Sequence, residues 1–289
     1  MPSASLPTAI LGRTGLEVTR LGYGAAHRRA LTDDEIGNML NRVLDVGINF
    51  IDTANDYGNS EEMIGRYIRS RRDEYVLATK CGCHPRDGHV WTRENLERGL
   101  HESLARLRVD SVDIMQLHNP SVAACEEGDL VRCLEDMRSQ GHVRWIGVSS
   151  TLPHLPTFLE WGVFDVFQIP YSLLETEHEE SISQVARADA GTIIRGGVAL
   201  GEPGHGTSTE QAWESVQNGL LDDLTAPGES RTALLLRLTL AHPGLHTTIV
   251  GTTNPDHLDE NMKATLAGPL SEDVVNEARS RLGLGAGPA

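Results

Sequence analysis

The feature that most constrains this chain is a regular alternation of short apolar runs with amphipathic helical segments. The apolar runs predict eight strands, at residues 21–24, 48–52, 75–79, 112–117, 143–148, 165–169, 192–195 and 247–250. These runs do not alternate apolar with polar residues, which is typical of parallel strands that are buried on both faces. Eight such β/α units predict an α/β fold, a (β/α)8 TIM barrel.

The remaining segments add to this barrel rather than forming a second one. Residues 10–19, with a turn at 12–15, predict an N-terminal β-hairpin, and residues 209–224 and 271–281 predict two extra helices. No stretch is long enough for an inter-domain linker, so we expect a single domain over residues 1–289, a natural length for one barrel. We expect the ends, residues 1–8 and 285–289, to be flexible.

The composition argues against several classes of partner. The net charge of −16 opposes binding to the phosphate backbone of nucleic acids. No run reaches the roughly 18 apolar residues of a membrane span, and the N-terminus lacks the basic and apolar regions of a secretory signal. We therefore expect a cytoplasmic protein that binds neither nucleic acid nor membrane. The sequence carries no signal for an oligomeric state.

The cysteines invite a metal-site interpretation, which the spacing does not support. In the cytoplasm, all four cysteines should be reduced. The run from Cys81 through Cys83 to His84 superficially resembles a metal cluster. No second Cys or His pair stands at zinc-finger spacing, so we expect no metal site.

Polar side chains lie at the ends of three neighbouring predicted strands. Asp52 ends the second strand, Tyr57 follows in the next loop, and Lys80 and His118 end the third and fourth strands. Each also has a structural interpretation, as a turn-forming acid, a half-buried phenol, one half of an ion pair, or a hydrogen-bonded imidazole. Because barrel enzymes hold their active sites at the carboxyl ends of the strands, we expect the four to converge.

These residues belong to motifs that resemble the aldo-keto reductase family. The resemblance extends from the hairpin to Asn261 and is carried by residues 47–58, 78–80, 113–118, 146–149, Gln168 and 251–261. It implies an oxidoreductase that reduces an aldehyde, ketone or sugar carbonyl with NADPH, or with NADH in its place. The family's catalytic tetrad would fall on Asp52, Tyr57, Lys80 and His118.

The chemistry of carbonyl reduction explains why such a tetrad is needed. A phenol has an ordinary pKa of about 10 and is a poor proton donor near neutrality. An ammonium about 4 Å away favours the phenolate by roughly 4 kcal/mol at an effective dielectric constant near 20. We therefore expect Lys80, held charged by Asp52, to lower the pKa of Tyr57 toward neutrality, and His118 to orient the carbonyl by a hydrogen bond. The hydride must come from a reduced nicotinamide, because no side chain supplies one.

The resemblance also implies where the nucleotide binds. Ser149 and Gln168 would hold the carboxamide, and Arg195 replaces an aromatic ring that stacks on the nicotinamide in many relatives. Asn254 reads as the cap of a helix N-terminus suited to an anion. The residues expected at the cofactor are Gly24, Ser149, Gln168, Arg195, Val198, Gly201, Gly251, Thr252, Thr253, His257, Glu260 and Asn261.

The cofactor preference and two other functions stay open at this point. The resemblance leaves NADPH as the favoured cofactor. Gly251 and His257 stand where many relatives have Lys and Arg at the 2′-phosphate, so we do not expect a strict preference over NADH. A barrel that binds the nucleotide could instead be a redox-sensing or regulatory subunit with little turnover. A phosphosugar isomerase or lyase could use Lys80 as a base or Schiff-base former. The reductase is favoured because a binding protein has no need of both Tyr57 and Lys80.

Overall fold

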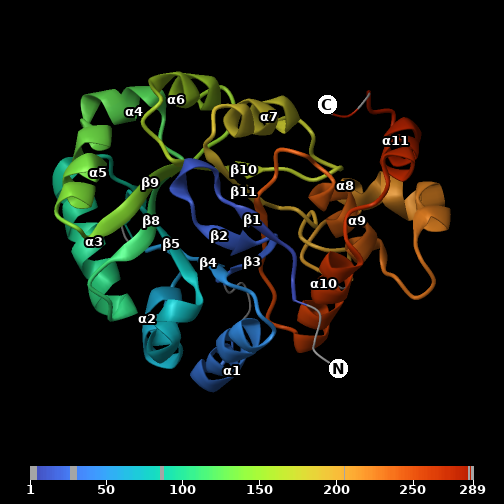
Figure 1. Ribbon diagram of the computed structural model, residues 1–289, viewed down its shortest axis with the longest axis horizontal. Helices are drawn as coiled ribbons and strands as arrows, with labels where there is room; N and C mark the ends of the chain where they lie inside the picture. Colours follow the sequence, from blue (N-terminus) through green and yellow to red (C-terminus); the bar gives the residue numbers. More distant parts are fainter. Residues whose placement is uncertain (1–4, 27–30, 85–87, 205, 286, 288–289) are drawn as a thin grey trace.

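The protein is described by a computed structural model over residues 5–26, 31–84, 88–204, 206–285 and 287. Within these residues, eight parallel strands form a closed barrel in which the last strand pairs with the first (Figure 1). In order around the barrel they are β3 (Leu21–Gly24), β4 (Phe50–Asp52), β5 (Val76–Cys81), β8 (Val112–His118), β9 (Val143–Ser149), β10 (Val166–Pro170), β11 (Gly191–Arg195) and β12 (Thr247–Val250). The predicted (β/α)8 TIM barrel is confirmed.

A helix follows each barrel strand and lies outside the barrel (Figure 1). Thr32 and Glu35 form a capping box at the first of these helices. In chain order they are α1 (Asp33–Asp45), α2 (Ser60–Tyr67), α3 (Arg93–Leu107), α5 (Leu130–Ser139), α6 (Leu155–Trp161), α7 (Glu179–Arg187), α9 (Arg231–Leu240) and α10 (Pro255–Ala267). Their apolar faces and the outer faces of the strands form one large buried cluster.

The predicted N-terminal hairpin covers one end of the barrel. It consists of β1 (Thr8–Ile10), a 3-10 turn (Gly12–Thr14) and β2 (Glu17–Thr19), and it crosses the barrel in Figure 1. Leu11, Leu16 and Val18 from this segment are buried together with inward-facing residues of the strands, among them Phe50 and Ile114. The hairpin therefore fills the amino-terminal end of the barrel with apolar side chains.

Several elements differ from the prediction. The helix expected at 209–224 is α8 (Glu210–Ser215), followed by a π turn (Val216–Leu220) and a 3-10 turn (Asp222–Leu224). Asn218 and Gly219 are poor helix formers, which accounts for the break. A short helix, α4 (Val122–Glu127), and a small hairpin, β6 (Cys83–His84) with β7 (Gly88–His89), were not predicted. The terminal helix is α11 (Glu272–Arg281), and a 3-10 segment (Arg69–Glu74) follows α2.

Near the strand ends, Asn59 does not cap a helix through its side chain, and Lys80 lies within a strand. Asn59 stands at the N-cap of α2, but its side chain makes no capping hydrogen bond, because its backbone (φ −93°, ψ 10°) is not extended as a capping residue requires. Lys80, expected at the end of the third strand, is the last residue but one of β5. The lysine is therefore held within the barrel wall rather than on a loop.

Two further expectations concern membrane-spanning helices and the ends of the chain. Among the described residues, no helix combines the length and the apolar character needed to cross a membrane. Of the ends expected to be flexible, residues 1–4, 286 and 288–289 lie outside the part of the chain that the structure describes.

Candidate active site

A buried ion pair lies at the carboxyl end of the barrel. Asp52, the last residue of β4, pairs in register with Ala78 of β5, and Lys80 lies two residues further along the same face of β5. The Lys80 Nζ is 2.5 Å from Asp52 Oδ2, and both side chains are essentially inaccessible to solvent. The other carboxylate oxygen, Oδ1, accepts hydrogen bonds from the amides of Gln116 (3.0 Å) and Gln168 (2.9 Å). Both oxygens of the Asp52 carboxylate thus have partners within the protein.

The Tyr57 hydroxyl meets this pair from the loop after β4. Lys80 Nζ is 3.4 Å from the hydroxyl and 4.8 Å from the centre of the phenol ring, and it also donates to the Thr53 carbonyl at 2.9 Å. The turn is closed by the Tyr57 amide, which donates to the Ala54 carbonyl at 3.2 Å. The structure therefore brings three of the four predicted catalytic side chains into direct contact.

Burial and neighbouring charges have opposite effects on the pKa values of Lys80 and Tyr57. Burial tends to lower the pKa of Lys80, but the Asp52 carboxylate and Tyr57 raise it more strongly, so the lysine stays charged. Burial also raises the pKa of Tyr57 above its ordinary value, and the Lys80 charge lowers it only in part. The expectation that Lys80 brings the pKa of Tyr57 near neutrality was wrong for this state, because it underweighted the cost of burying a phenolate.

The fourth predicted side chain, His118, lies beside Tyr57. It is the last residue of β8, and its ring meets the Tyr57 ring edge-on with centroids 5.8 Å apart. His118 Nδ1 is 3.1 Å from the Cys83 sulfur and 3.5 Å from a carboxylate oxygen of Asp56. Its Nε2 makes no hydrogen bond with any residue that the structure describes. One ring nitrogen is thus held by the protein and the other is available to a ligand.

A cleft of about 1190 Å³ opens above Asp52 and Tyr57, and neither Lys80 nor His118 is among the described residues that line it. Asp52, Tyr57 and Gln168 form its base, and it continues over the loop after β11 to the start of α10. The predicted cofactor residues that line it are Gly24, Gln168, Arg195, Val198, Gly201, Gly251, Thr252, Thr253, His257, Glu260 and Asn261. Ser149 does not line the cleft; it is buried, with its hydroxyl 3.5 Å from Asn119 Oδ1.

Arg195 brings an unpaired positive charge to this cleft. It is the last residue of β11, and its guanidinium makes no ion pair or hydrogen bond with the described residues. Burial lowers its pKa, although the nearby acids Glu175 and Asp52 oppose this effect. A partly buried cation without a partner is suited to an anionic or π-electron-rich ligand.

The start of α10 has the predicted cap, and this cap occupies one of the backbone amides of the first turn. Asn254 Oδ1 accepts from the Asp256 amide at 3.0 Å, and Pro255 is the first helical residue. The Tyr23 hydroxyl donates to the Thr252 carbonyl at 2.9 Å and ties this segment to β3. A Cβ atom on Gly251 would lie 3.0 Å from the Gly24 carbonyl oxygen, so the two backbones already lie close together here.

Sequence reasoning missed several residues of the site. Gln116 precedes His118 by two positions, so the two-residue period of a strand could have placed it on the same inner face. Cys83 was considered only as a metal ligand, and its contact with His118 depends on tertiary packing. Glu175 also lies in a segment whose path depends on tertiary packing, and no local pattern singles it out.

Comparisons with known proteins identify the class. The chain matches the Aldo/keto reductase family over residues 20–281. It therefore belongs to the aldo-keto reductase family of oxidoreductases. It is 28% identical, over 93% of this chain and 94% of the relative, to an uncharacterized oxidoreductase, YqkF, of Bacillus subtilis. It is 26% identical, over 88% of this chain and 86% of the relative, to L-galactose dehydrogenase of Arabidopsis thaliana.

Comparison with solved structures agrees with the family assignment. The holo form of the aldo-keto reductase AKR11C1 from Bacillus halodurans superposes with a TM-score of 0.84 and 23% identity, covering 98% of each chain. At that identity the likeness concerns the fold, and the barrel is that of an aldo-keto reductase.

Proposed function

We propose that this protein reduces an aldehyde, ketone or sugar carbonyl by hydride transfer from NADPH, with Tyr57 as the proton donor. The observation that carries the proposal is the contact of the Lys80 ammonium with the Tyr57 hydroxyl, 3.4 Å apart, at the base of a large cleft. A purely structural ion pair would have no need of a phenol at that position.

Tyr57 gives its proton to the carbonyl oxygen, and Lys80 stabilises the phenolate that remains. Since burial raises the pKa of Tyr57, the hydroxyl is protonated at neutral pH but is a weak acid by itself, so the transfer of its proton depends on the neighbouring Lys80 ammonium. At 3.4 Å the ammonium is worth up to about 5 kcal/mol to the phenolate at an effective dielectric near 20, which offsets part of the cost of burial. Asp52 keeps the ammonium charged and in place.

His118 orients the carbonyl through Nε2. Burial raises the pKa of the Cys83 thiol to about 12, so the thiol stays protonated, and we assign His118 the tautomer in which Nδ1 accepts a hydrogen bond from this thiol. The ring then carries its own proton on Nε2, where it donates a hydrogen bond to the substrate oxygen.

The cleft fits a nicotinamide nucleotide, which supplies the hydride when bound. Arg195, which has no hydrogen-bond or ion-pair partner among the described residues, would hold the nicotinamide end together with Gln168. Residues 198–201 would lie at the pyrophosphate, and Thr252, Thr253 and the segment from His257 to Asn261 would hold the adenosine end. NADPH is the proposed cofactor, and NADH could replace it, because among the described residues that line the cleft at the start of α10 only His257 can carry a positive charge.

The alternative functions have less support. A Schiff-base or general-base lysine must lose its proton, whereas Lys80 is inaccessible, paired with Asp52 and has a raised pKa. A regulatory barrel without turnover would not need the buried pair to contact Tyr57.

The test is a panel of aldehydes, ketones and aldoses incubated with NADPH and, separately, with NADH, while the absorbance of the reduced nicotinamide is followed. We expect turnover of at least one carbonyl class, faster with NADPH. Tight nucleotide binding without turnover of any class would contradict the reductase and favour the regulatory barrel.

A further inference from the structure

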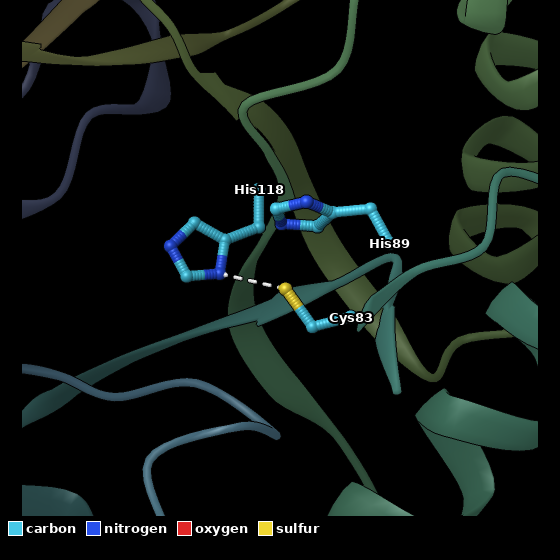
Figure 2. Close-up of side chains that lie close together, drawn as sticks. All are labelled: Cys83, His89 and His118. Carbon is cyan, nitrogen blue, oxygen red and sulfur yellow. Dashed lines mark hydrogen bonds between the residues drawn. The ribbon is translucent and has the colours of Figure 1, made fainter. Parts of the chain in front are cut away.

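Three metal-ligating side chains converge beside the candidate active site. Cys83, on β6, and His89, on β7, are directly opposite each other in the small hairpin, and His118 ends the barrel strand β8. One potential ligand atom from each of the three lies within 4.8 Å of the others. Figure 2 shows one ring nitrogen of His118 facing the Cys83 sulfur, with the His89 ring beside them.

The surrounding contacts hold these side chains in position. The His118 Nδ1 and the Cys83 sulfur are 3.1 Å apart, as the dashed line in Figure 2 marks. The His89 ring stacks on Trp91 with centroids 5.3 Å apart and an angle of 10° between the planes. Cys83 is buried whereas His89 is exposed, so an ion can reach the cluster from solvent on the His89 side.

The donor set selects the class of ion. One thiolate and two imidazoles suit zinc, whereas magnesium and calcium prefer oxygen ligands. With Zn–S near 2.3 Å and Zn–N near 2.0–2.1 Å, tetrahedral ligand atoms lie roughly 3.3–3.7 Å apart. The Cys83 sulfur and His118 Nδ1, 3.1 Å apart, therefore need to open slightly, and donors as far apart as 4.8 Å need to close by about 1 Å. The Asp56 carboxylate, 3.5 Å from His118 Nδ1, adds negative charge that favours a cation.

We propose that Cys83, His89 and His118 form a binding site for a zinc ion, with water in the fourth position. Binding releases the thiol proton of Cys83 to solvent and joins the sulfur and His118 Nδ1 through the metal. Nε2 of His118 remains outside the coordination shell, so the ion is a neighbour of the substrate position and does not occupy it.

The interpretation drawn from the sequence considered only the run from Cys81 to His84, and it found no second pair of ligands. The structure supplies the missing ligands from a hairpin strand and from a barrel strand 35 residues beyond Cys83. No spacing rule for a local zinc motif covers such a separation.

The test uses the purified full-length protein and Co²⁺ as a spectroscopic substitute for Zn²⁺. We expect one Co²⁺ per chain, a thiolate-to-cobalt charge-transfer absorption, and its loss when Zn²⁺ is added. Cys83→Ser should abolish the thiolate absorption, and Cys83→Ser and His89→Ala should each weaken binding at least about tenfold, since each removes one of three protein ligands.

Two matched controls define the result. Cys81→Ser alters a buried cysteine whose sulfur is 3.6 Å from the Gln116 carbonyl oxygen, and His101→Ala alters an exposed histidine on α3; both should bind as the wild type does. His89 is exposed, so His89→Ala tests the site even if Cys83→Ser does not fold. Binding without thiolate absorption, or binding unaffected by His89→Ala, would overturn the proposal. Because the readout is metal binding, the result is independent of whether the protein is a reductase.

Discussion

The buried pair of Lys80 and Asp52 allows a quantitative prediction about stability. In Asp52→Asn, the ammonium loses its carboxylate and keeps only the Thr53 carbonyl and the Tyr57 hydroxyl as partners. Removing one partner of a buried pair typically costs about 3–5 kcal/mol. Lys80 can instead lose its proton in the folded variant. Deprotonating a lysine of ordinary pKa at pH 7 costs about 5 kcal/mol, so this value limits the electrostatic part of the loss of stability.

The converse variant and the double variant complete the cycle. In Lys80→Met, the Asp52 carboxylate keeps the amides of Gln116 and Gln168, and the expected loss is again about 3–5 kcal/mol. In the double variant neither charge is left alone, so its loss should fall short of the sum of the two single losses by at least about 2 kcal/mol.

The pH dependence has a defined sign. In the wild type the pKa of Lys80 is raised, so the pair contributes fully below the unfolded pKa and is lost only as pH rises through the folded value. In Asp52→Asn the folded pKa of Lys80 falls below the unfolded one. The folded state then binds fewer protons between the two values, and the stability of the variant should rise relative to the wild type from pH 7 toward pH 10.

Urea denaturation, monitored by tryptophan fluorescence, measures the free energy of unfolding of the wild type, the two single variants and the double variant. Equal slopes with shifted midpoints would report changes in stability alone. Two results would refute the argument that a charged Lys80 depends on Asp52. One is a loss of stability in the double variant equal to the sum of the two single losses, and the other is a difference in stability between Asp52→Asn and the wild type that does not change with pH.

Three further predictions concern the cleft. Arg195→Met keeps an aliphatic wall but removes the unpaired charge, and it should raise the Kd for NADPH at least about tenfold in a fluorescence titration; an unchanged Kd would show that the guanidinium does not contact the nucleotide. His257→Arg should raise the preference for NADPH over NADH by at least about fivefold in kcat/KM, because a bidentate cation binds a phosphate better than imidazole does; no change would place the 2′-phosphate elsewhere. Gly206→Ala should lower NADPH affinity or thermal stability, since its Cβ would lie 2.2 Å from the Leu200 carbonyl oxygen; wild-type values in both measurements would contradict a close-packed loop.

Much of the architecture could be predicted because strand patterns and helix caps are local signals. The strands β3 and β12 have the predicted bounds, and Asn254 caps α10 as expected. The convergence of Asp52, Tyr57 and Lys80 followed from barrel topology, since the carboxyl ends of adjacent strands share one face.

What could not be predicted depends on packing between distant segments. The burial of Tyr57, which decides the direction of its pKa shift, is a property of the assembled site. The same holds for the contact between Cys83 and His118, residues from two different strands. Ser149 was expected at the cofactor from resemblance alone, and its side chain lies outside the residues that line the cleft.

The most direct test of the proton-donor role is hydride transfer in a single turnover by Tyr57→Phe. This variant removes only the hydroxyl that Lys80 contacts, and the ring continues to fill its place. We predict a Kd for NADPH within about twofold of the wild type and a rate of hydride transfer lower by about 10²–10⁴-fold, the usual contribution of a positioned acid. Hydride transfer at the wild-type rate in this variant would contradict the account.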